Sequence, residues 1–283
     1  MNDILMQIRS DLPSFSKGQK RIANYILESY DKAAFMTASR LGKMVEVSES
    51  TVVRFAVELG FDGYPSMQKT LQELVRNKLT SVQRIEVTND RLGNQDVVST
   101  VLQGDIDSIR MTSEALSRAE MDACVQAILK AKSIYIVGVR SSAALAAFLN
   151  FYLRNMFENV RLVGSTSTSE MFEQLLRVGP EDVVISLPRY SSRTVKVMQY
   201  AHDTGATCIA VTDKPDAPAG KVADHVLVAK SDMVSVVDSL VAPMSVVNAL
   251  VVSLAQEQQT QMAKTYEDLE TLWDEYDVYE RVE

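Results

Sequence analysis

Residues 47–65 read VSESTVVRFAVELGFDGYP and predict a short helix with a capped start and an abrupt end. Ser48 is a natural N-cap, because its hydroxyl can accept a hydrogen bond from a backbone N–H group. Gly60 suits the left-handed position that follows a last helical turn. The apolar residues recur at helical spacing and predict a buried stripe, which consists of Val52, Phe55, Ala56 and Leu59.

The opposite face of this helix is polar and carries one cation. Ser50 and Arg54 point away from the apolar stripe, with Thr51 on the flank near the N-terminus. Hydroxyls at a helix start, followed by an arginine one turn later, suit a helix that reads the DNA major groove. The alternative is that Arg54 only solvates the surface and pairs with Glu58 at i+4.

The neighbouring residues favour the DNA interpretation. The segment TASRLGKM, residues 37–44, predicts a supporting helix joined to 48–59 by a short turn, as in a helix-turn-helix. An earlier helix, predicted over 17–30, adds Lys17 and Arg21 as candidate DNA contacts. We therefore expect DNA to be bound by Ser50, Thr51, Arg54, Lys17 and Arg21.

The segment TASRLGKMVEVSESTVVRFAVELGFDGYPSMQ resembles the N-terminal helix-turn-helix domain of the RpiR family of bacterial transcription regulators. The resemblance spans roughly residues 1–78 and rests on S-x-S-T-V-V-R-F followed by L-G-F-x-G-Y. It implies that Ser50, Thr51 and Arg54 lie on the DNA-facing helix. One departure is Glu46, which stands where such turns favour glycine and would cost up to ~1 kcal/mol if its backbone is left-handed.

Composition and charge fit a soluble regulator with two domains. The chain has 283 residues, 46% hydrophobic and 23% charged. Its net charge is −8, but residues 1–80 hold eleven Lys and Arg against nine Asp and Glu, so this part is +2 and the remainder −10. The N-terminus lacks the pattern of a signal peptide, so we expect a cytoplasmic protein without membrane association. Cys124 and Cys208 lie in apolar patterns that suit reduced core thiols rather than a disulfide or zinc site.

Periodicity divides the chain into an all-helical part and an α/β part. We predict a helix-turn-helix domain over 1–78, a linker over 79–95 and a second domain over 96–283. From Ser133 onward, short β-rich runs alternate with helical runs, a pattern typical of βαβ units with a parallel sheet. A long helix over 240–264 and an acidic, aromatic helix near 265–280 are expected to close the chain.

Two strand-to-helix junctions of the second domain are rich in hydroxyls. They read VGVRSSAALA over 137–146 and SLPRYSSRTVK over 186–196. Hydroxyls and backbone N–H groups at the carboxyl end of a parallel strand can form an anion site, and two such loops could hold a phosphorylated small molecule. The alternative is that these serines and Thr194 only cap helices.

This second half resembles a sugar isomerase (SIS) domain over about 120–260, the usual partner of this helix-turn-helix in RpiR-type regulators. The family's first loop is similar to G-x-G-x-S and here reads Gly138-Val139-Arg140-Ser141-Ser142; its second is similar to S-x-S/T-G-x-T and here reads Arg189-Tyr190-Ser191-Ser192-Arg193-Thr194. Arg140 replaces a usual Gly, Arg189 a usual Ser and Ser192 a usual Gly. The resemblance makes Ser142, Ser191 and Thr194 the phosphate contacts that carry over.

The two replacing arginines leave two possibilities open. They could favour a ligand with more negative charge, such as a sugar acid phosphate, through bidentate pairing. They could instead pair with Glu170 or Glu173 and fill the pocket. The candidate effector-binding residues are Arg140, Ser141, Ser142, Arg189, Ser191, Ser192, Thr194 and Glu170.

The expected function is a DNA-binding transcription regulator of a carbohydrate-metabolism operon, controlled by a phosphorylated sugar or sugar-acid effector. We expect no catalytic residue, because neither histidine is predicted near the loops and Glu170 better suits a structural or orienting role. No metal ion or organic cofactor is expected. The alternative is a sugar-phosphate isomerase with an N-terminal assembly domain. One recognition helix contacts few bases, so we expect a homodimer or a dimer of dimers on a near-palindrome. The 240–254 helix and residues Leu269, Leu272 and Trp273 are interface candidates, unless they cover their own subunit's core.

Overall fold

The computed structural model describes residues 4–78, 85, 88, 96–188, 191–231 and 237–279. The chain divides into two compact units, one comprising Met1–Val101 with Met233–Asp238 and the other Leu102–Asp232 with Ser239–Glu283. Most of the expected linker, residues 79–95, lies outside the described residues, so that boundary stays a prediction.

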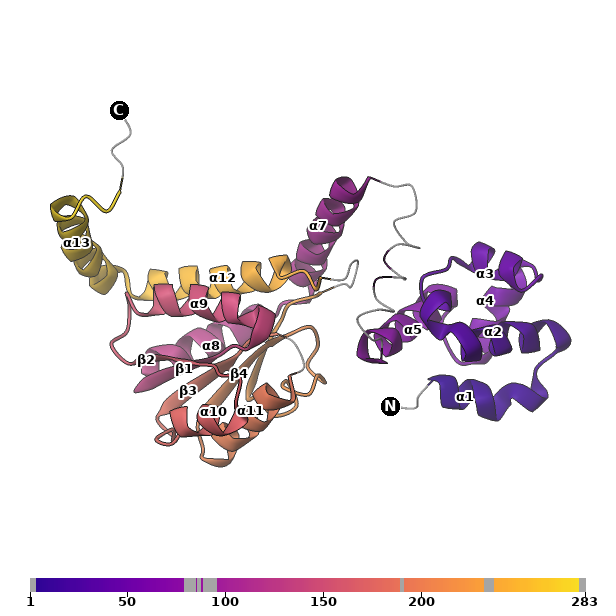
Figure 1. Cartoon of the computed structure of the whole chain (residues 1–283), viewed down its shortest axis with the longest axis horizontal. Helices are drawn as coiled ribbons and strands as arrows, with labels where there is room; N and C mark the ends of the chain where they lie inside the picture. The colour runs from indigo at the N-terminus through magenta and orange to yellow at the C-terminus, as the bar shows by residue number, and fades with distance from the viewer. Residues whose placement is uncertain are drawn as a thin grey trace. The chain divides into compact units, whose positions relative to one another are not determined.

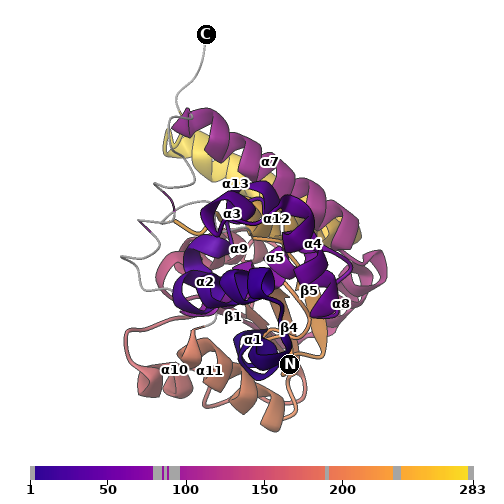
Figure 2. The same ribbon diagram turned by 90° about the vertical axis from the view of Figure 1, so that its right-hand side faces the viewer.

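Every described secondary-structure element that lies wholly in the first unit is a helix, as predicted (Figures 1 and 2). Its elements are α1 (Ile4–Asp11), the short 3-10 helix η1 (Leu12–Ser14), α2 (Lys17–Ala33), α3 (Ala38–Met44), α4 (Glu49–Glu58) and α5 (Tyr64–Lys78). Ser16 starts α2 with a capping box, in which its backbone N–H donates to the Gln19 side chain over 2.9 Å. The five α-helices share one apolar core, which includes Ile8, Ile22, Leu41, Phe55 and Leu71.

The L-G-F-x-G-Y run has a structural explanation in Tyr64. This side chain is buried, and its hydroxyl donates a hydrogen bond of 2.7 Å to the Met36 carbonyl in the connection between α2 and α3. Burial raises the pKa of Tyr64 to about 12. Tyr64 therefore fastens the start of α5 to the segment that leads into α3, and this holds the helix pair α3–α4 in place.

The second unit contains a five-stranded parallel sheet in the order β2-β1-β3-β4-β5. The strands are β1 (Ser133–Val137), β2 (Val160–Val163), β3 (Asp182–Ser186), β4 (Thr207–Thr212) and β5 (His225–Val228). The helices are α8 (Arg118–Lys130), α9 (Ala143–Leu153), α10 (Thr168–Gln174), α11 (Ser192–Asp203), α12 (Val241–Glu257) and α13 (Gln259–Glu275), and the short 3-10 helix η2 (Arg140–Ser142) precedes α9. Another helix, α7 (Val97–Ala115), precedes α8. The predicted βαβ alternation with a parallel sheet is confirmed.

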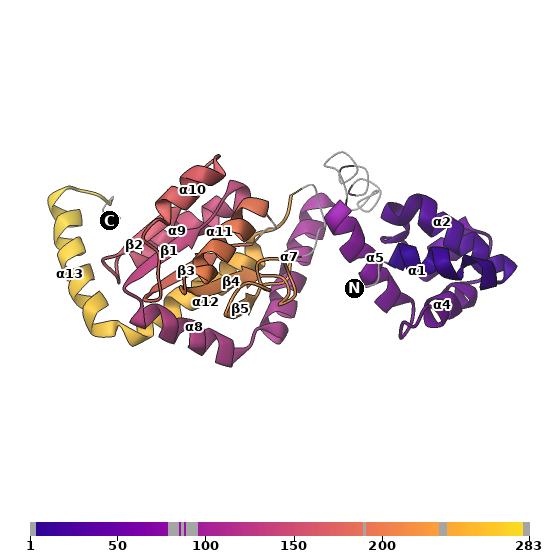
Figure 3. The ribbon, with the colours of Figure 1, turned by 90° about the horizontal axis from the view of Figure 1, so that it is seen from below.

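The sheet is the middle of three layers. Ile134, Ile136 and Ile185 pack with residues of α8, α9 and α12 on one face. Tyr135, Val137 and Val184 alternate with them and pack with α10 and α11 on the other face. Figures 1 and 3 show these helices on the two sides of the strands. The second unit is therefore an αβα sandwich around the expected parallel sheet.

The C-terminal helices differ from the prediction in one respect. The prediction of a single helix over 240–264 is wrong. Instead, α12 ends at Glu257 and the chain turns at Gln258 (φ −107°, ψ 23°) before α13 begins (Figure 1). The apolar residues of α12 cover their own sheet: Val246, Val247, Leu250 and Leu254 are buried in its core. This packing favours the alternative reading of α12 over a subunit interface. Among the described residues, no helix has the length and apolar character needed to cross a membrane.

Candidate functional site

The turn between α3 and α4 brings the two helices very close together. Thr37 caps α3 and Ser48 caps α4, each by accepting a backbone N–H three residues on. The Val47 N–H donates to the Gly42 carbonyl over 2.8 Å. A Cβ added at Gly42 would lie only 2.8 Å from the Val47 carbonyl oxygen, so this crossing requires glycine. The predicted helix-turn-helix is thus present, with a tight contact at its centre.

The turn holds Glu46 in the left-handed conformation expected of a glycine. Its φ is 54°. The Arg21 guanidinium donates to the Glu46 carbonyl over 2.8 Å and to its carboxylate over 3.3 Å. These bonds hold the strained turn against α2. Arg21 therefore has an internal partner, and a contact between Arg21 and DNA stays a prediction.

The outward face of α4 is as predicted. Val52, Phe55, Ala56 and Leu59 are buried, and Phe15 meets Phe55 edge to face at a centroid distance of 5.1 Å. Gly60 follows the helix with φ 88°. Ser50 and Arg54 are exposed and Thr51 is half-buried.

Arg54 is positioned by its own helix. Its Nε donates to the Ser50 carbonyl over 3.3 Å, which leaves the end of the guanidinium at the surface. The surface pair with Glu58 is not formed, since the Glu58 carboxylate accepts a hydrogen bond from the Gln19 amide instead. Lys17 is also exposed, at the start of α2. A cation, hydroxyls and a helix N-terminus are thus presented together on α4 and suit a phosphate or base edge.

The two hydroxyl-rich loops lie next to each other. They follow β1 and β3, which are hydrogen-bonded neighbours with Val137 opposite Ser186. The chain after β1 enters α9 on one face of the sheet, and the chain after β3 enters α11 on the other. In open parallel sheets the crevice at such a switch point is where ligands bind, and here two helix N-termini converge on it.

The first loop is shaped by two special backbone positions. A Cβ at Gly138 would lie 2.4 Å from the Ala146 Cβ, so glycine lets α9 approach the strand. Arg140 has φ 56°, a left-handed conformation in the place of the family's glycine, and its side chain is exposed. Ser142 is buried; its hydroxyl donates to the Val139 carbonyl over 2.8 Å and accepts from the Val139 N–H over 3.2 Å. Ser142 thus closes its own loop, whereas Arg140 and Ser141 face solvent.

The second loop presents hydroxyls at the start of α11. Ser191 is half-buried, Ser192 exposed and Thr194 buried. Within the described part of the chain, Ser191 makes no capping hydrogen bond to the helix that it precedes. The Arg193 guanidinium donates to the Ser165 carbonyl over 3.4 Å and so joins this loop to the loop after β2. Arg189 lies outside the described residues.

A third loop, after β2, completes the carboxyl edge. A Cβ at Gly164 would lie 2.9 Å from the Gly138 carbonyl oxygen, so the loops after β1 and β2 are in close contact. Glu170 is exposed, and its carboxylate accepts a hydrogen bond from the Ser165 hydroxyl. No ion pair joins Arg140 to Glu170 or Glu173 in the described ranges.

Ser186, at the end of β3, was missed by the sequence reasoning. The residue is only 1% exposed, and its Oγ has no hydrogen-bond partner among the residues that the structure describes. A buried hydroxyl without a partner is uncommon in folded proteins. The signal in the sequence was a serine at the end of the apolar run DVVIS.

The histidines and cysteines lie away from these loops. His225 starts β5 and approaches Glu120 at 3.3 Å, and His202 is near the end of α11, both at the amino edge of the sheet. Cys124 and Cys208 are buried and free, and burial raises the pKa of each to about 12. The expectations of core thiols and of histidines distant from the loops are confirmed.

Two protein-family models match the chain. The helix-turn-helix domain of the rpiR family matches residues 2–78, and the SIS domain matches residues 127–253. A Haemophilus influenzae protein, named as an HTH-type transcriptional regulator, is 28% identical over 231 residues, which cover 80% of this chain and 79% of the relative.

Solved structures resemble each part of the fold. The sugar isomerase domain of an RpiR transcription factor from Sphaerobacter thermophilus is 26% identical, covers 62% of this chain and 98% of its own, and superposes with a TM-score of 0.59. Vibrio vulnificus NanR, solved in complex with ManNAc-6P, is 21% identical, covers 95% of this chain and 98% of its own, and gives a TM-score of 0.58. The helix-turn-helix with its L-G-F-x-G-Y extension and the SIS sheet make this chain a member of the RpiR family of transcription regulators.

Proposed function

We propose that the protein binds operator DNA of a carbohydrate-metabolism operon through α4 and is controlled by a phosphorylated sugar or sugar acid at the carboxyl edge of its sheet. The observation that carries this proposal is the switch point between β1 and β3, where α9 and α11 begin on opposite faces of the sheet at the same carboxyl edge. The binding of ManNAc-6P by the similar NanR protein supports the ligand class.

The DNA-binding part rests on Arg54 and the hydroxyls before it. Arg54→Ala should weaken operator binding by at least ~1 kcal/mol, about fivefold in Kd, without unfolding the protein. Gel-shift titration with the upstream region of its own operon measures this loss. Arg9→Ala, which removes an exposed arginine of α1 in the same unit, is the matched control and should bind normally. Unchanged affinity of Arg54→Ala would remove this residue from the DNA surface.

The proposal for effector binding rests on Arg140, whose guanidinium can form two parallel hydrogen bonds with an anion beside the N-terminus of α9. Arg140→Gly removes the guanidinium and fits the left-handed backbone, so the variant should fold while losing affinity for anionic ligands. Arg154→Ala, at the other end of α9, is the control. Thermal shift with a panel of sugar phosphates and sugar acid phosphates, ManNAc-6P included, measures binding, since a ligand of the folded state must raise Tm.

The panel also tests which phosphorylated ligand is preferred. A guanidinium free of acidic partners among the described residues can pair with a carboxylate in addition to a phosphate. We therefore expect sugar acid phosphates to raise Tm more than the matching aldose or ketose phosphates, and Arg140→Gly to remove that difference. An equal response to both classes would contradict the role assigned to Arg140.

We also propose that the regulator acts as a homodimer or a dimer of dimers. On α7, Leu102, Ile106 and Ile109 form an apolar stripe that is 57%, 51% and 39% exposed. Burial of this stripe between subunits would let the effector bias the spacing of two DNA-reading helices, a coupling worth ~1–3 kcal/mol. Light scattering of Leu102→Glu should show a smaller assembly than that of the unmodified chain.

The isomerase alternative requires a base beside the substrate carbon. Glu170 is the candidate base, but its carboxylate is exposed and already accepts from Ser165, which suits orientation rather than proton abstraction. Incubation with aldose and ketose phosphates tests this alternative. Interconversion that depends on Glu170 would favour an enzyme over a sensor.

A further inference from the structure

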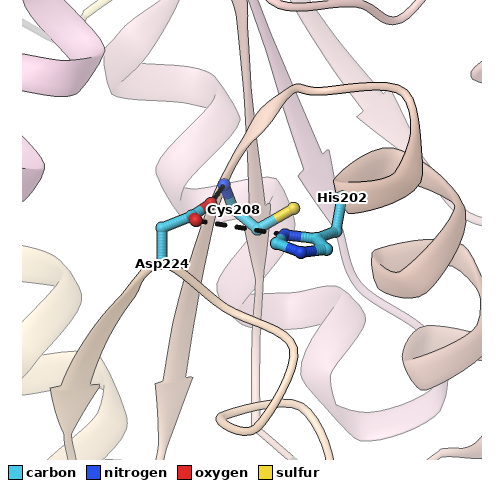
Figure 4. A group of neighbouring side chains, drawn as sticks. All are labelled: His202, Cys208 and Asp224. Atoms are coloured by element: carbon cyan, nitrogen blue, oxygen red, sulfur yellow. Dashed lines mark hydrogen bonds and ion pairs between the residues drawn. The ribbon is translucent and has the colours of Figure 1, made fainter.

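Three side chains with metal-binding atoms meet at the amino edge of the SIS sheet (Figure 4). His202 comes from the last turn of α11, Cys208 from the second position of β4, and Asp224 from the residue before β5. One donor atom from each lies within 4.8 Å of the others. His202 Nδ1 and Asp224 Oδ1 are 3.9 Å apart.

The cluster is held by the backbone of the sheet. The Asp224 N–H donates to the Cys208 carbonyl over 2.9 Å, and the Cys208 N–H donates to Asp224 Oδ2 over 2.8 Å. The Cys208 sulfur is buried at the base, whereas the His202 and Asp224 side chains at the rim are 47% and 41% exposed. The sulfur of Cys208 is thus fixed in the core, and the side chains of His202 and Asp224 lie above it. These two side chains can rotate toward a common centre that is open to solvent.

We propose that His202, Cys208 and Asp224 bind one divalent cation of the zinc type, with water as the fourth ligand. Zinc accepts this mixture of nitrogen, sulfur and oxygen, at bond lengths of about 2.0–2.3 Å, so neighbouring ligands of a tetrahedral site lie about 3.4 Å apart. The distance between His202 and Asp224 exceeds this value by about half an ångström, which a small rotation of an exposed side chain removes. Binding forms the metal–sulfur bond, breaks the S–H bond and releases that proton to solvent, without oxidation or reduction.

Structural roles explain only part of the cluster. Asp224 ties β5 to β4 through its two bonds with Cys208. Among the described residues, the thiol contacts only the Met198 and Ala206 carbonyl oxygens, each at a long 3.7 Å. Neither role needs an imidazole beside the carboxylate. The burial that raises the pKa of Cys208 will weaken metal binding at neutral pH, but a bound cation stabilises the thiolate.

The site is separate from the proposed effector site. α11 has 12 residues, so its two ends are about 18 Å apart at ~1.5 Å per residue. Its first turn carries the hydroxyls of the second loop, and its last turn carries His202. A metal ion would therefore fasten the far end of this helix to β4 and β5, and the proposal stands independently of DNA or effector binding.

The chain offers matched controls, because one of its two cysteines and one of its two histidines belong to the cluster, and the other cysteine and histidine lie outside it. Bound metal is removed from the full-length protein with a chelator, and the chelator is then exchanged for buffer with a phosphine reductant that keeps the thiols reduced. The protein is titrated with Co²⁺, whose absorption spectrum reports coordination by a thiolate. Zn²⁺ content after gel filtration and the Tm with Zn²⁺ are measured on the same samples. We expect one ion per chain, a thiolate-to-cobalt band and a raised Tm.

His202→Ala, Cys208→Ala and Asp224→Asn should each weaken binding at least tenfold. Cys124→Ala and His225→Gln should leave it unchanged, although Cys124 is equally buried. His202→Ala changes an exposed side chain and so keeps the test valid if Cys208→Ala fails to fold. The proposal is overturned if no thiolate band forms, if His202→Ala binds as tightly as the unmodified chain, or if the control variants lose the ion to the same extent.

Discussion

Replacing Gly42 by alanine tests the contact at the centre of the helix-turn-helix. The added Cβ would lie 2.8 Å from the Val47 carbonyl oxygen and 3.4 Å from the backbone of Ser48 and Glu49. Because the obstacle is backbone, the turn must shift by about 0.6 Å to restore an ordinary contact of about 3.4 Å. Overpacking of this kind costs up to ~3 kcal/mol, and the better helix propensity of alanine returns ~1 kcal/mol, so we expect a net loss of ~2 kcal/mol.

A matched control is available in Gly18, a glycine near the start of α2 that faces the same turn. A Cβ at Gly18 would meet only methyl groups of Val47 and Thr51, at 3.5 and 3.6 Å. Gly18→Ala should therefore be neutral or stabilise the unit by up to ~1 kcal/mol. The two variants add the same methyl group to the same domain, and they should change its stability in opposite directions.

Urea unfolding of the full chain, followed by helical circular dichroism, measures both effects. The single tryptophan, Trp273, lies in α13, so its fluorescence reports the other unit as an internal reference. In thermal unfolding, a loss of ~2 kcal/mol lowers the Tm of a domain this small by about 10 °C. If Gly42→Ala were as stable as the unmodified protein and bound operator DNA equally well, the close crossing of α3 and α4 would be refuted.

Three further predictions concern the same two units. Tyr64→Phe should cost ~1 kcal/mol in urea unfolding, since it removes the hydroxyl's hydrogen bond to the buried Met36 carbonyl, which keeps the Gln68 amide as its other donor. Burial raises the pKa of Cys124 from 9.0 in the unfolded chain to about 12 in the folded one. Its contribution to the free energy of unfolding should therefore be fully present below pH 9 and be lost as the pH rises from 9 to about 12. In alkaline denaturation, Cys124→Ala should make the fall of the unfolding free energy with pH less steep, by up to ~1.4 kcal/mol per pH unit. Glu46→Gly should stabilise the first unit by up to ~1 kcal/mol in the same urea assay, because relief of the left-handed strain exceeds the loss of an exposed ion pair; a destabilised variant would contradict this account.

The sequence could predict features that depend on local periodicity and on parallel-sheet geometry. The apolar stripe of α4 and its end at Gly60 follow from helical spacing, and both are present. The loops after β1 and β3 were expected to share an edge because parallel strands end on the same side, and the strand order makes them direct neighbours. These predictions needed no knowledge of distant contacts.

Features that depend on tertiary contacts could not be predicted. The break at Gln258 falls in a run of helix-forming polar residues without glycine or proline, so no local signal marks it. Arg21 was assigned to DNA, whereas its guanidinium also holds the Glu46 turn from another helix. The meeting of His202 with Cys208 depends on how α11 packs against β4, and spacing along the chain does not reveal it.

Both proposed functional regions contain a non-glycine residue with a left-handed backbone. Among the described residues, Glu46 and Arg140 have positive φ, as does Asp277 near the C-terminus. Glu46 and Arg140 stand where the family pattern favours glycine, and the left-handed backbone at each costs ~1 kcal/mol of conformational strain that glycine would avoid. Such strain persists where a side chain contributes something that glycine cannot. At Glu46 the carboxylate accepts from Arg21, but this ion pair is exposed and weaker than the strain, and the bond from Arg21 to the Glu46 carbonyl does not need the side chain. At Arg140 the exposed guanidinium has no internal acid as partner among the described residues, which agrees with the proposal that it binds an anionic effector.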